Sequence, residues 1–409
     1  MSIKPITDYQ QAAKTLRQSD LRQGLYDEGA VLMDGVLVNL HGEKHRARRS
    51  LENKVFRRGF FQHYEKEVFP DTLRVTIDEF VSGGGGDLVE FGFRSLMNLT
   101  CDFAGIDRPE GTQDETDRLL LLMRTFALGT TLAHSKDDRE KIRQQVRDAL
   151  SAFDQEFLQP SMARRFLLIS KCEADEVVED ELPRDVLTVL LRNEDQIELD
   201  GQELVREMAF FVVAGAQTSI HSLVHVMHEI FSWSTDHAGG RQKLRSDPML
   251  LQRCVHESAR LHPSSPVARR RAECPLTLAT DELVETGELV TIDLLGANRD
   301  EKIFGPDAAQ FNPYRQTDKG SSPYGLSFGL GMHACIGRTL AAGVTPKPDS
   351  NPLDHQYGTI TLIASALLEH GARPDPEKPP KMDEKTERPN WGFYPVILDR
   401  PNHEESSTQ

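Results

Sequence analysis

Cysteine is scarce in this 409-residue chain, and no two cysteines stand in a C-x-x-C spacing. The five cysteines are Cys101, Cys172, Cys254, Cys274 and Cys335. So few thiols disfavour a zinc site, iron–sulfur ligation or a disulfide framework, and they suit a reducing compartment. Residues 1–11 are polar, and no apolar run of about 18 residues lies near them, which disfavours a membrane anchor and a signal peptide. We therefore predict a cytoplasmic protein without a membrane anchor.

Positive charge is also in deficit, because 48 Lys and Arg residues stand against 64 Asp and Glu residues, a net charge of −16. Such an acidic chain is unsuited to holding a polyanion, although basic residues cluster at 44–49 and 269–271. Local basic sites inside an acidic protein suit a small anion better. We therefore expect no nucleic-acid partner.

Two common signatures of metal and phosphate sites are absent as well. His221, His225 and His228 recur at helical spacing, but without an H-E-x-x-H motif we interpret them as a packed or solvated stripe. The glycine run at 83–86 is not followed by G-K-[ST]. We interpret this run as a flexible connector and not as a phosphate cradle.

The most specific signal is a glycine-rich segment around Cys335. Gly331 and Gly337 permit backbone conformations closed to other residues and let a flat cofactor approach closely. A predicted helix at 336–342 would point unpaired N–H groups at the sulfur, lower the pKa of the thiol and favour the thiolate. The segment therefore predicts a loop that aims a thiolate at a metal, whereas a lone cysteine in such a turn is more often a buried structural residue.

This segment resembles the haem-binding loop F-x-x-G-x-H-x-C-x-G of the cytochrome P450 monooxygenases. Four further landmarks of that family occur in the family's order. They are H-x-x-x-R at His45 to Arg49, the oxygen-binding groove at Ala214 to Ser219, E-x-x-R at Glu257 to Arg260, and the segment Phe311 to Arg315. Because five landmarks span residues 45–337, chance is a poor explanation, and the chain is identified as a member of this family.

The resemblance implies the P450 fold, which is mainly α-helical with small β-sheets. Helices are expected at residues 9–19, 43–56, 63–82, 93–106, 113–129, 136–158, 184–193, 201–232, 248–261 and 336–342, and strands near 275–278, 288–295 and 391–398. The family's N-terminal A helix and first strands are expected to be missing, since its second helix is matched from Thr7 onward. We expect one domain over residues 1–403, with an inserted proline-rich loop at 343–358 and a disordered tail at 404–409.

The resemblance also implies a binding site for haem b (iron protoporphyrin IX). Its residues would be His45, Arg49, Ala214, Gly215, Arg270, Phe328, Gly331, His333, Cys335 and Gly337. Cys335 would be the axial ligand of the iron. His45, Arg49 and one of the arginines at 269–271, with Arg270 preferred, would hold the propionates. The pocket walls are expected in the loop 25–38, at Phe210, Phe211, Val267 and Ala268, and in the turn 391–393.

Three charged residues are expected to support this loop. Glu257 and Arg260 share one helix face, and Arg315 would complete an ion-pair triad in the family. Spacing alone would leave an ordinary exposed pair, which contributes a few tenths of a kcal/mol. The resemblance favours the structural triad.

Thr218 and Gln217 are the expected catalytic residues. The Thr218 hydroxyl can bond to its own i−4 carbonyl or take part in a proton relay. The family usually has an acid before this threonine, whereas this chain has Gln217. Either ordered water replaces the acid, or the natural oxidant differs.

The resemblance implies a haem-thiolate monooxygenase that inserts one atom of O2 into a small or medium apolar organic substrate. Its electrons would come from an external ferredoxin and ferredoxin reductase. A peroxide-driven oxygenase is the alternative that Gln217 suggests. A catalytically silent relative that binds and activates another enzyme is the alternative from a different class.

Overall fold

The structure is a computed structural model that describes residues 4–197, 199–317, 320–347 and 349–399. The predicted tail at 404–409 lies outside the described residues. The helices are α1 (Tyr9–Arg17), α2 (Ala30–Met33), α3 (Gly42–Glu52), α4 (Arg58–His63), α5 (Phe69–Ser82), α6 (Leu88–Ala104), α7 (Gln113–Thr130), α8 (Arg139–Phe153), α9 (Gln159–Glu173), α10 (Val186–Leu191), α11 (Gly201–Asp236), α12 (Gly240–Ser246), α13 (Pro248–Leu261), α14 (Leu294–Ala297), α15 (Glu301–Phe304), α16 (Arg338–Ala342) and α17 (Thr359–Glu369).

The strands are short and form four small antiparallel sheets. They are β1 (Leu21–Gln23), β2 (Gly85–Asp87), β3 (Val267–Ala272), β4 (Leu276–Thr277), β5 (Leu283–Val284), β6 (Leu289–Asp293), β7 (Arg373–Pro374), β8 (Lys381–Met382), β9 (Trp391–Phe393) and β10 (Pro395–Ile397). The sheet orders are β1-β3-β6, β2-β10-β7, β4-β5 and β8-β9. The expected class, mainly α with small sheets, is confirmed.

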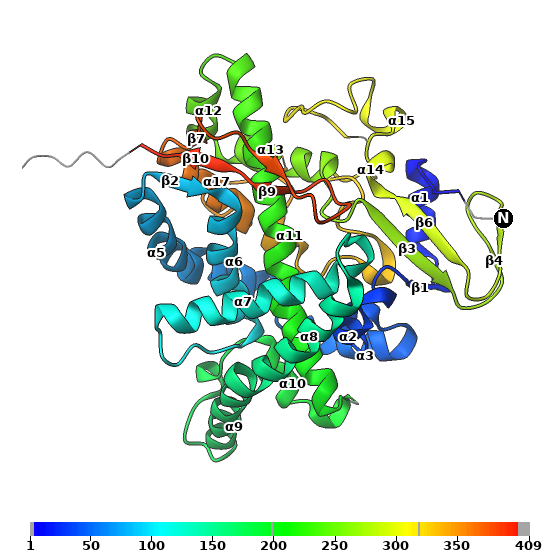
Figure 1. Cartoon of the computed structure of the whole chain (residues 1–409), viewed down its shortest axis with the longest axis vertical. Helices are drawn as coiled ribbons and strands as arrows, with labels where there is room; N and C mark the ends of the chain where they lie inside the picture. The colour runs from blue at the N-terminus through cyan, green and yellow to red at the C-terminus, as the bar shows by residue number, and fades with distance from the viewer. Residues whose placement is uncertain (1–3, 198, 318–319, 348, 400–409) are drawn as a thin grey trace, which may run out of the picture.

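The long helix α11 runs through the middle of the molecule, with β1, β3 and β6 on one side and α5, α6 and β2 on the other (Figure 1). Its start is fixed by a capping box, in which the Asp200 side chain accepts from the backbone N–H of Glu203 and Glu203 reciprocates. The helix is long and apolar enough to cross a membrane, but 67% of its most apolar window is buried inside the molecule. Its apolarity is therefore that of a core helix.

A glycine lets α6 approach the middle of α11. A Cβ at Gly215 would lie 2.7 Å from Cγ2 of Thr100, and the Thr100 hydroxyl lies 3.0 Å from the carbonyl oxygen of Val212 on α11. On this side of α11, Gly215 therefore makes room for a neighbouring helix.

Strand β3 carries a buried arginine toward the centre of the molecule. Buried and half-buried residues alternate along β3, and Arg270 is on its buried face. β3 pairs with β1 on one edge and β6 on the other, and Gln23 of β1 lies opposite Arg270. Folding thus brings two segments about 250 residues apart in sequence to one place.

Two predictions about local structure are wrong. The glycine run at 83–86 is not a loose connector, because Gly85 to Asp87 form β2 and pair with β10. Gly85 is required there, since its φ is +108° and a Cβ would lie 2.3 Å from the carbonyl oxygen of Val396. The helix expected to end at residue 158 continues through a π-helical turn into α9, where Pro160 occupies the first turn and its missing N–H is tolerated.

Candidate functional site

A central cavity of about 330 Å³ lies between α11 and the loop that precedes α16. Much of its wall is apolar and comes from segments far apart in sequence: Leu25, Val38, Phe56, Leu96, Phe103, Phe210, Phe211, Val267, Ala268 and Leu340. Most of the predicted wall therefore lines the cavity. The turn at 391–393 does not, because Trp391 packs instead against the rings of His228 and Tyr394.

The loop around Cys335 is a tight turn closed by its own backbone. The backbone N–H of Cys335 donates to the carbonyl oxygen of Phe328 at 2.8 Å. Gly331 has a φ of +70°, and a Cβ there would lie 2.9 Å from the carbonyl oxygen of Leu16 at the end of α1. A guanidinium nitrogen of Arg49 donates to the carbonyl oxygen of Ala334 at 2.6 Å. Two N-terminal helices, α1 and α3, therefore hold the loop in place.

The Cys335 side chain is exposed, and its exposed surface faces the cavity. Loss of bulk water raises the pKa of the thiol above its ordinary value, and the backbone N–H of Gly337 and the guanidinium of Arg49 offset this only in part. The lowered pKa predicted from a helix dipole is therefore wrong for the protein alone. The helix begins at Arg338, later than predicted, and has only 5 residues.

Four of the basic side chains that line the cavity lie in or beside the loop. They are His45, Arg49, Arg270 and His333. The rings of His45 and His333 meet edge to face at 4.9 Å, and loss of water lowers their pKa values to about 4 and about 3, so both are neutral at pH 7. Nδ1 of His45 and both ring nitrogens of His333 are buried without a partner in the described part of the chain.

Arg270 remains cationic in its buried position. Its guanidinium donates to Oε1 of Gln23 at 2.8 Å, and loss of water lowers its pKa to about 10. The cavity thus combines a largely apolar wall with a thiol, two arginines and unpartnered imidazole nitrogens. This set of groups fits an iron porphyrin that carries two carboxylates. Phe328 and Gly337 also line the cavity.

The opposite wall is the small-residue face of α11. Ala214, Gly215 and Thr218 line the cavity, and the hydroxyl of Thr218 donates to the carbonyl oxygen of Ala214 at 2.8 Å. Of the two states predicted for Thr218, the structure therefore contains the bond within its own helix. Oε1 of Gln217 accepts from the hydroxyl of Thr130 on α7 at 3.2 Å.

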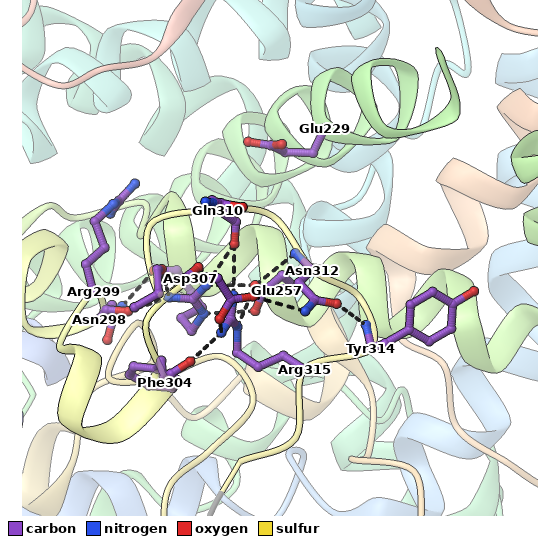
Figure 2. A network of polar contacts seen from close by, with 12 residues as sticks. Glu229, Glu257, Asn298, Arg299, Phe304, Asp307, Gln310, Asn312, Tyr314 and Arg315 are labelled. Carbon is purple, nitrogen blue, oxygen red and sulfur yellow. Dashed lines mark hydrogen bonds and ion pairs between the residues drawn. The ribbon is translucent and has the colours of Figure 1, made fainter. Parts of the chain in front are cut away.

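The predicted triad forms, and Figure 2 shows two of its members, Glu257 and Arg315, side by side. Arg260 binds both carboxylate oxygens of Glu257 at 2.7 and 2.8 Å, and Nε of Arg315 donates to Glu257 at 2.9 Å. Arg260 also donates to the carbonyl oxygens of Asn298 and Ala308. Since Arg260 is 0% and Glu257 is 4% exposed, the ordinary surface pair is excluded.

Asn298 connects this triad to the segment before Cys335. Its side-chain amide donates to the carbonyl oxygen of Arg260 at 3.0 Å, and its Oδ1 accepts from the backbone N–H of Leu326 at 2.7 Å. It also donates to Ser327, whose hydroxyl donates to the carbonyl oxygen of Ala259 on α13. Through Asn298, the triad thereby anchors residues 326 and 327, which lead into the loop around Cys335.

The predicted loop at 343–358 leaves the end of α16 and returns at the start of α17. Its neck is tied by Gln252, whose amide nitrogen lies 3.0–3.2 Å from four backbone carbonyl oxygens there. Nε2 of His256 lies 2.8 Å from the carbonyl oxygen of Ala342, and Glu65 accepts from the backbone N–H groups of Tyr357 and Gly358. These bonds hold the loop's base against α13 and the π-helical turn that precedes α5.

Arg388 is one of the cavity residues that sequence reasoning missed, and it carries a charge. It lies in the segment before β9 and lines the cavity although it is 7% exposed. No local motif surrounds it, so only the folded chain reveals its position.

Comparison with known proteins agrees with this geometry. The family model described as Cytochrome P450 matches residues 120–343. The protein YjiB of Bacillus subtilis strain 168, which carries a cytochrome P450 name, is 23% identical over 346 residues, covering 81% of this chain and 76% of its own. Cytochrome P450 105A3 of Streptomyces carbophilus is 30% identical over 144 residues, 35% of this chain and 33% of its own.

Solved structures share the whole fold. CYP109B1 from Bacillus subtilis superimposes with a TM-score of 0.67 at 19% identity, over 96% of this chain and 93% of that one. P450BioI, solved with an acyl carrier protein carrying hexadec-9Z-enoic acid, gives a TM-score of 0.71 at 17% identity, over 96% and 91%. At these identities the likeness establishes the fold, and the family model adds the membership. The chain therefore belongs to the cytochrome P450 family, the haem-thiolate monooxygenases that act on organic substrates with O2 and redox partners.

Proposed function

We propose that Cys335 is the axial ligand of a haem b iron and that the enzyme inserts one atom of O2 into an apolar part of a small or medium organic substrate. The observation that carries this proposal is the Cys335 thiol at a largely apolar cavity that the small-residue face of α11 also lines. When bound, a thiolate-ligated haem supplies oxygen activation, because electron donation from sulfur favours O–O cleavage.

The cavity's basic residues would hold the two propionates of haem b. Arg49 and Arg270 are suited to this, because a guanidinium pairs a carboxylate through two parallel hydrogen bonds. The unpartnered nitrogens of His45 and His333 would complete the set. Gly331 lets α1 pack against the cysteine loop, and Ala214 and Gly215 on α11 present little side chain to the cavity.

Thr218 is the residue that would hold or move a proton on the α11 side. To donate into the cavity, its hydroxyl must release the carbonyl oxygen of Ala214. Gln217 cannot exchange a proton as a carboxylate does, so proton supply would pass through water next to Thr218. We expect Thr218→Ala to retain haem but to lose coupling between oxygen consumption and product, whereas Thr218→Ser keeps it. Full coupling in Thr218→Ala would contradict the relay.

Cofactor ligation is tested by the spectrum of the reduced protein under carbon monoxide. The wild type should show the strongly red-displaced absorption of thiolate ligation, and Cys335→Ala should lose it. Cys274→Ala is the matched control, since Cys274 is exposed and outside the cavity wall. Colourless wild-type protein after haem supplementation would favour the silent relative, and an imidazole-type spectrum would exclude Cys335 as ligand.

Electrons are proposed to come from a soluble ferredoxin and its reductase in the cytoplasm. A peroxide-driven oxygenase is the second candidate, and it is favoured by two observations. No Asp or Glu belongs to the cavity wall among the described residues, and Gln217 is engaged by Thr130. Turnover with reduced ferredoxin, compared with turnover on hydrogen peroxide alone, separates the two candidates.

A further inference from the structure

Arg388 follows a short segment that is bound to the turn after α7. Ser135 and Thr386 form an isolated antiparallel bridge, and the backbone N–H of Glu387 donates to the carbonyl oxygen of His134 at 2.9 Å. The backbone N–H of Arg388 donates to the Thr386 hydroxyl at 3.1 Å. The side chain therefore points from a fixed segment into the cavity wall.

The guanidinium of Arg388 is buried without a counter-charge. The residue is 7% exposed, its Nε has no hydrogen-bond partner, and within the described ranges no carboxylate forms an ion pair with it. Loss of water lowers the pKa of Arg388, but arginine stays protonated at neutral pH. A buried, unpaired charge is costly, so such residues usually meet a ligand or a partner.

Among the charged residues that line the cavity, Arg388 has no assigned anionic partner. Three arginines line it, Arg49, Arg270 and Arg388, and no Asp or Glu does among the residues that the structure describes. In the proposed function the two propionates of haem b pair with Arg49 and Arg270. One positive charge remains, and no carboxylate among the described residues of the cavity wall balances it.

Two histidines near Arg388 add hydrogen-bonding capacity but no charge. Loss of water, helped by the positive charge of Arg388, lowers the pKa values of His134 and His221 to about 4. Both rings are therefore neutral at pH 7. Nε2 of His134 and Nδ1 of His221 are buried and lack partners in the described part of the chain. A neutral imidazole can share a hydrogen bond with a guanidinium or an anion, but it cannot balance the charge.

We propose that Arg388 binds the carboxylate of the substrate, so that the substrate class is carboxylic acids with an apolar body. This inference rests on the proposed function, because it assigns the substrate of the same cavity. A carboxylate is the anion that matches a guanidinium through two parallel hydrogen bonds. Apolar residues such as Phe210 and Phe211 would hold the rest of the molecule.

The test is a binding titration of the haem-loaded protein, followed by the spectral change that accompanies loss of the distal water. The probes are decanoic, tetradecanoic and 4-tert-butylbenzoic acids, each paired with its own methyl ester. The variants are Arg388→Gln, which removes the charge, and Arg388→Lys, which keeps it. Lys385→Gln is the matched control, because Lys385 lies in the same segment with its side chain exposed to solvent.

We expect at least one wild-type acid to bind roughly tenfold or more tightly than its ester, as a charge-assisted hydrogen-bonded pair in a buried site should. Arg388→Gln should abolish this preference while ester binding changes less than about threefold, Arg388→Lys should retain part of it, and Lys385→Gln should leave it intact. Equal binding of every acid and its ester by the wild type would overturn the proposal, as would an unchanged preference in Arg388→Gln.

A haem propionate is the other carboxylate that Arg388 could serve. If Arg388→Gln is purified with clearly less haem than Lys385→Gln, the proposal is overturned in favour of that role. Failure of the proposed function looks different, because the wild type would then lack the red-displaced absorption under carbon monoxide before any acid is added.

Discussion

The contact between Gly215 on α11 and Thr100 on α6 provides a quantitative test of the fold around the cavity. Gly215→Ala places a Cβ 2.7 Å from Cγ2 of Thr100, well inside the carbon–carbon separation of about 3.5–4.0 Å that is optimal. Thr100 cannot turn aside cheaply, because it is β-branched and its hydroxyl lies 3.0 Å from the carbonyl oxygens of Leu96 and Val212.

The expected magnitude follows from two opposing effects. Overpacking costs about 1–3 kcal/mol in a well-packed core, whereas alanine in a helix interior is more favourable than glycine by about 1 kcal/mol. Gly215→Ala should therefore lower the free energy of unfolding by up to about 2 kcal/mol. In a Thr100→Ser background the clashing methyl group is gone and the hydroxyl remains. There the same substitution should be neutral or stabilising.

The assay is urea unfolding of the two single variants and the double variant, with Gly201→Ala as a control. Gly201 lies in the same helix, and a Cβ added there would meet no atom within 4 Å, so its substitution should be nearly neutral. In this double-mutant cycle, the double variant should be more stable than the sum of the two single effects predicts, by about 1–3 kcal/mol. Additivity within about 0.5 kcal/mol would refute the close approach of α6 to α11.

Two further predictions concern buried charge. Glu257→Gln leaves Arg260 and Arg315 without their carboxylate, so we expect the free energy of unfolding measured in urea to fall by about 3–5 kcal/mol. Glu273→Gln, which breaks an exposed pair, is the control and should cost less than about 1 kcal/mol. Similar losses in the two variants would show that the triad is not buried. Burial lowers the pKa of His256 from an ordinary 6.5 to about 4. The neutral imidazole therefore contributes fully to the free energy of unfolding above about pH 6.5, and this stabilisation is lost as the pH falls toward 4. At pH 5 the loss is about 2 kcal/mol. His256→Gln should therefore reduce the difference in unfolding free energy between pH 7.5 and pH 5 by that amount. An unchanged difference would show that the histidine is exposed to solvent.

Local sequence was sufficient for the elements whose signals are local. The sequence predicted a helix from residue 201, where α11 begins, and the glycines around Cys335 indicated a tight loop. The i, i+3 spacing put Glu257 and Arg260 on one face of α13. These signals act through backbone conformation and helix geometry within a few residues, so they can be read without the rest of the chain.

Only the tertiary structure decided the features that depend on distant partners. Gly85 and Gly86 of the glycine run became part of β2 because β10 offered hydrogen bonds. The pKa of Cys335 rises because desolvation outweighs the nearby N–H groups and arginines. Arg388 lines the cavity, and the segment just before it is bound to residues 134 and 135, which lie beyond α7. Burial and electrostatics sum over every neighbour in space, and sequence order does not specify those neighbours.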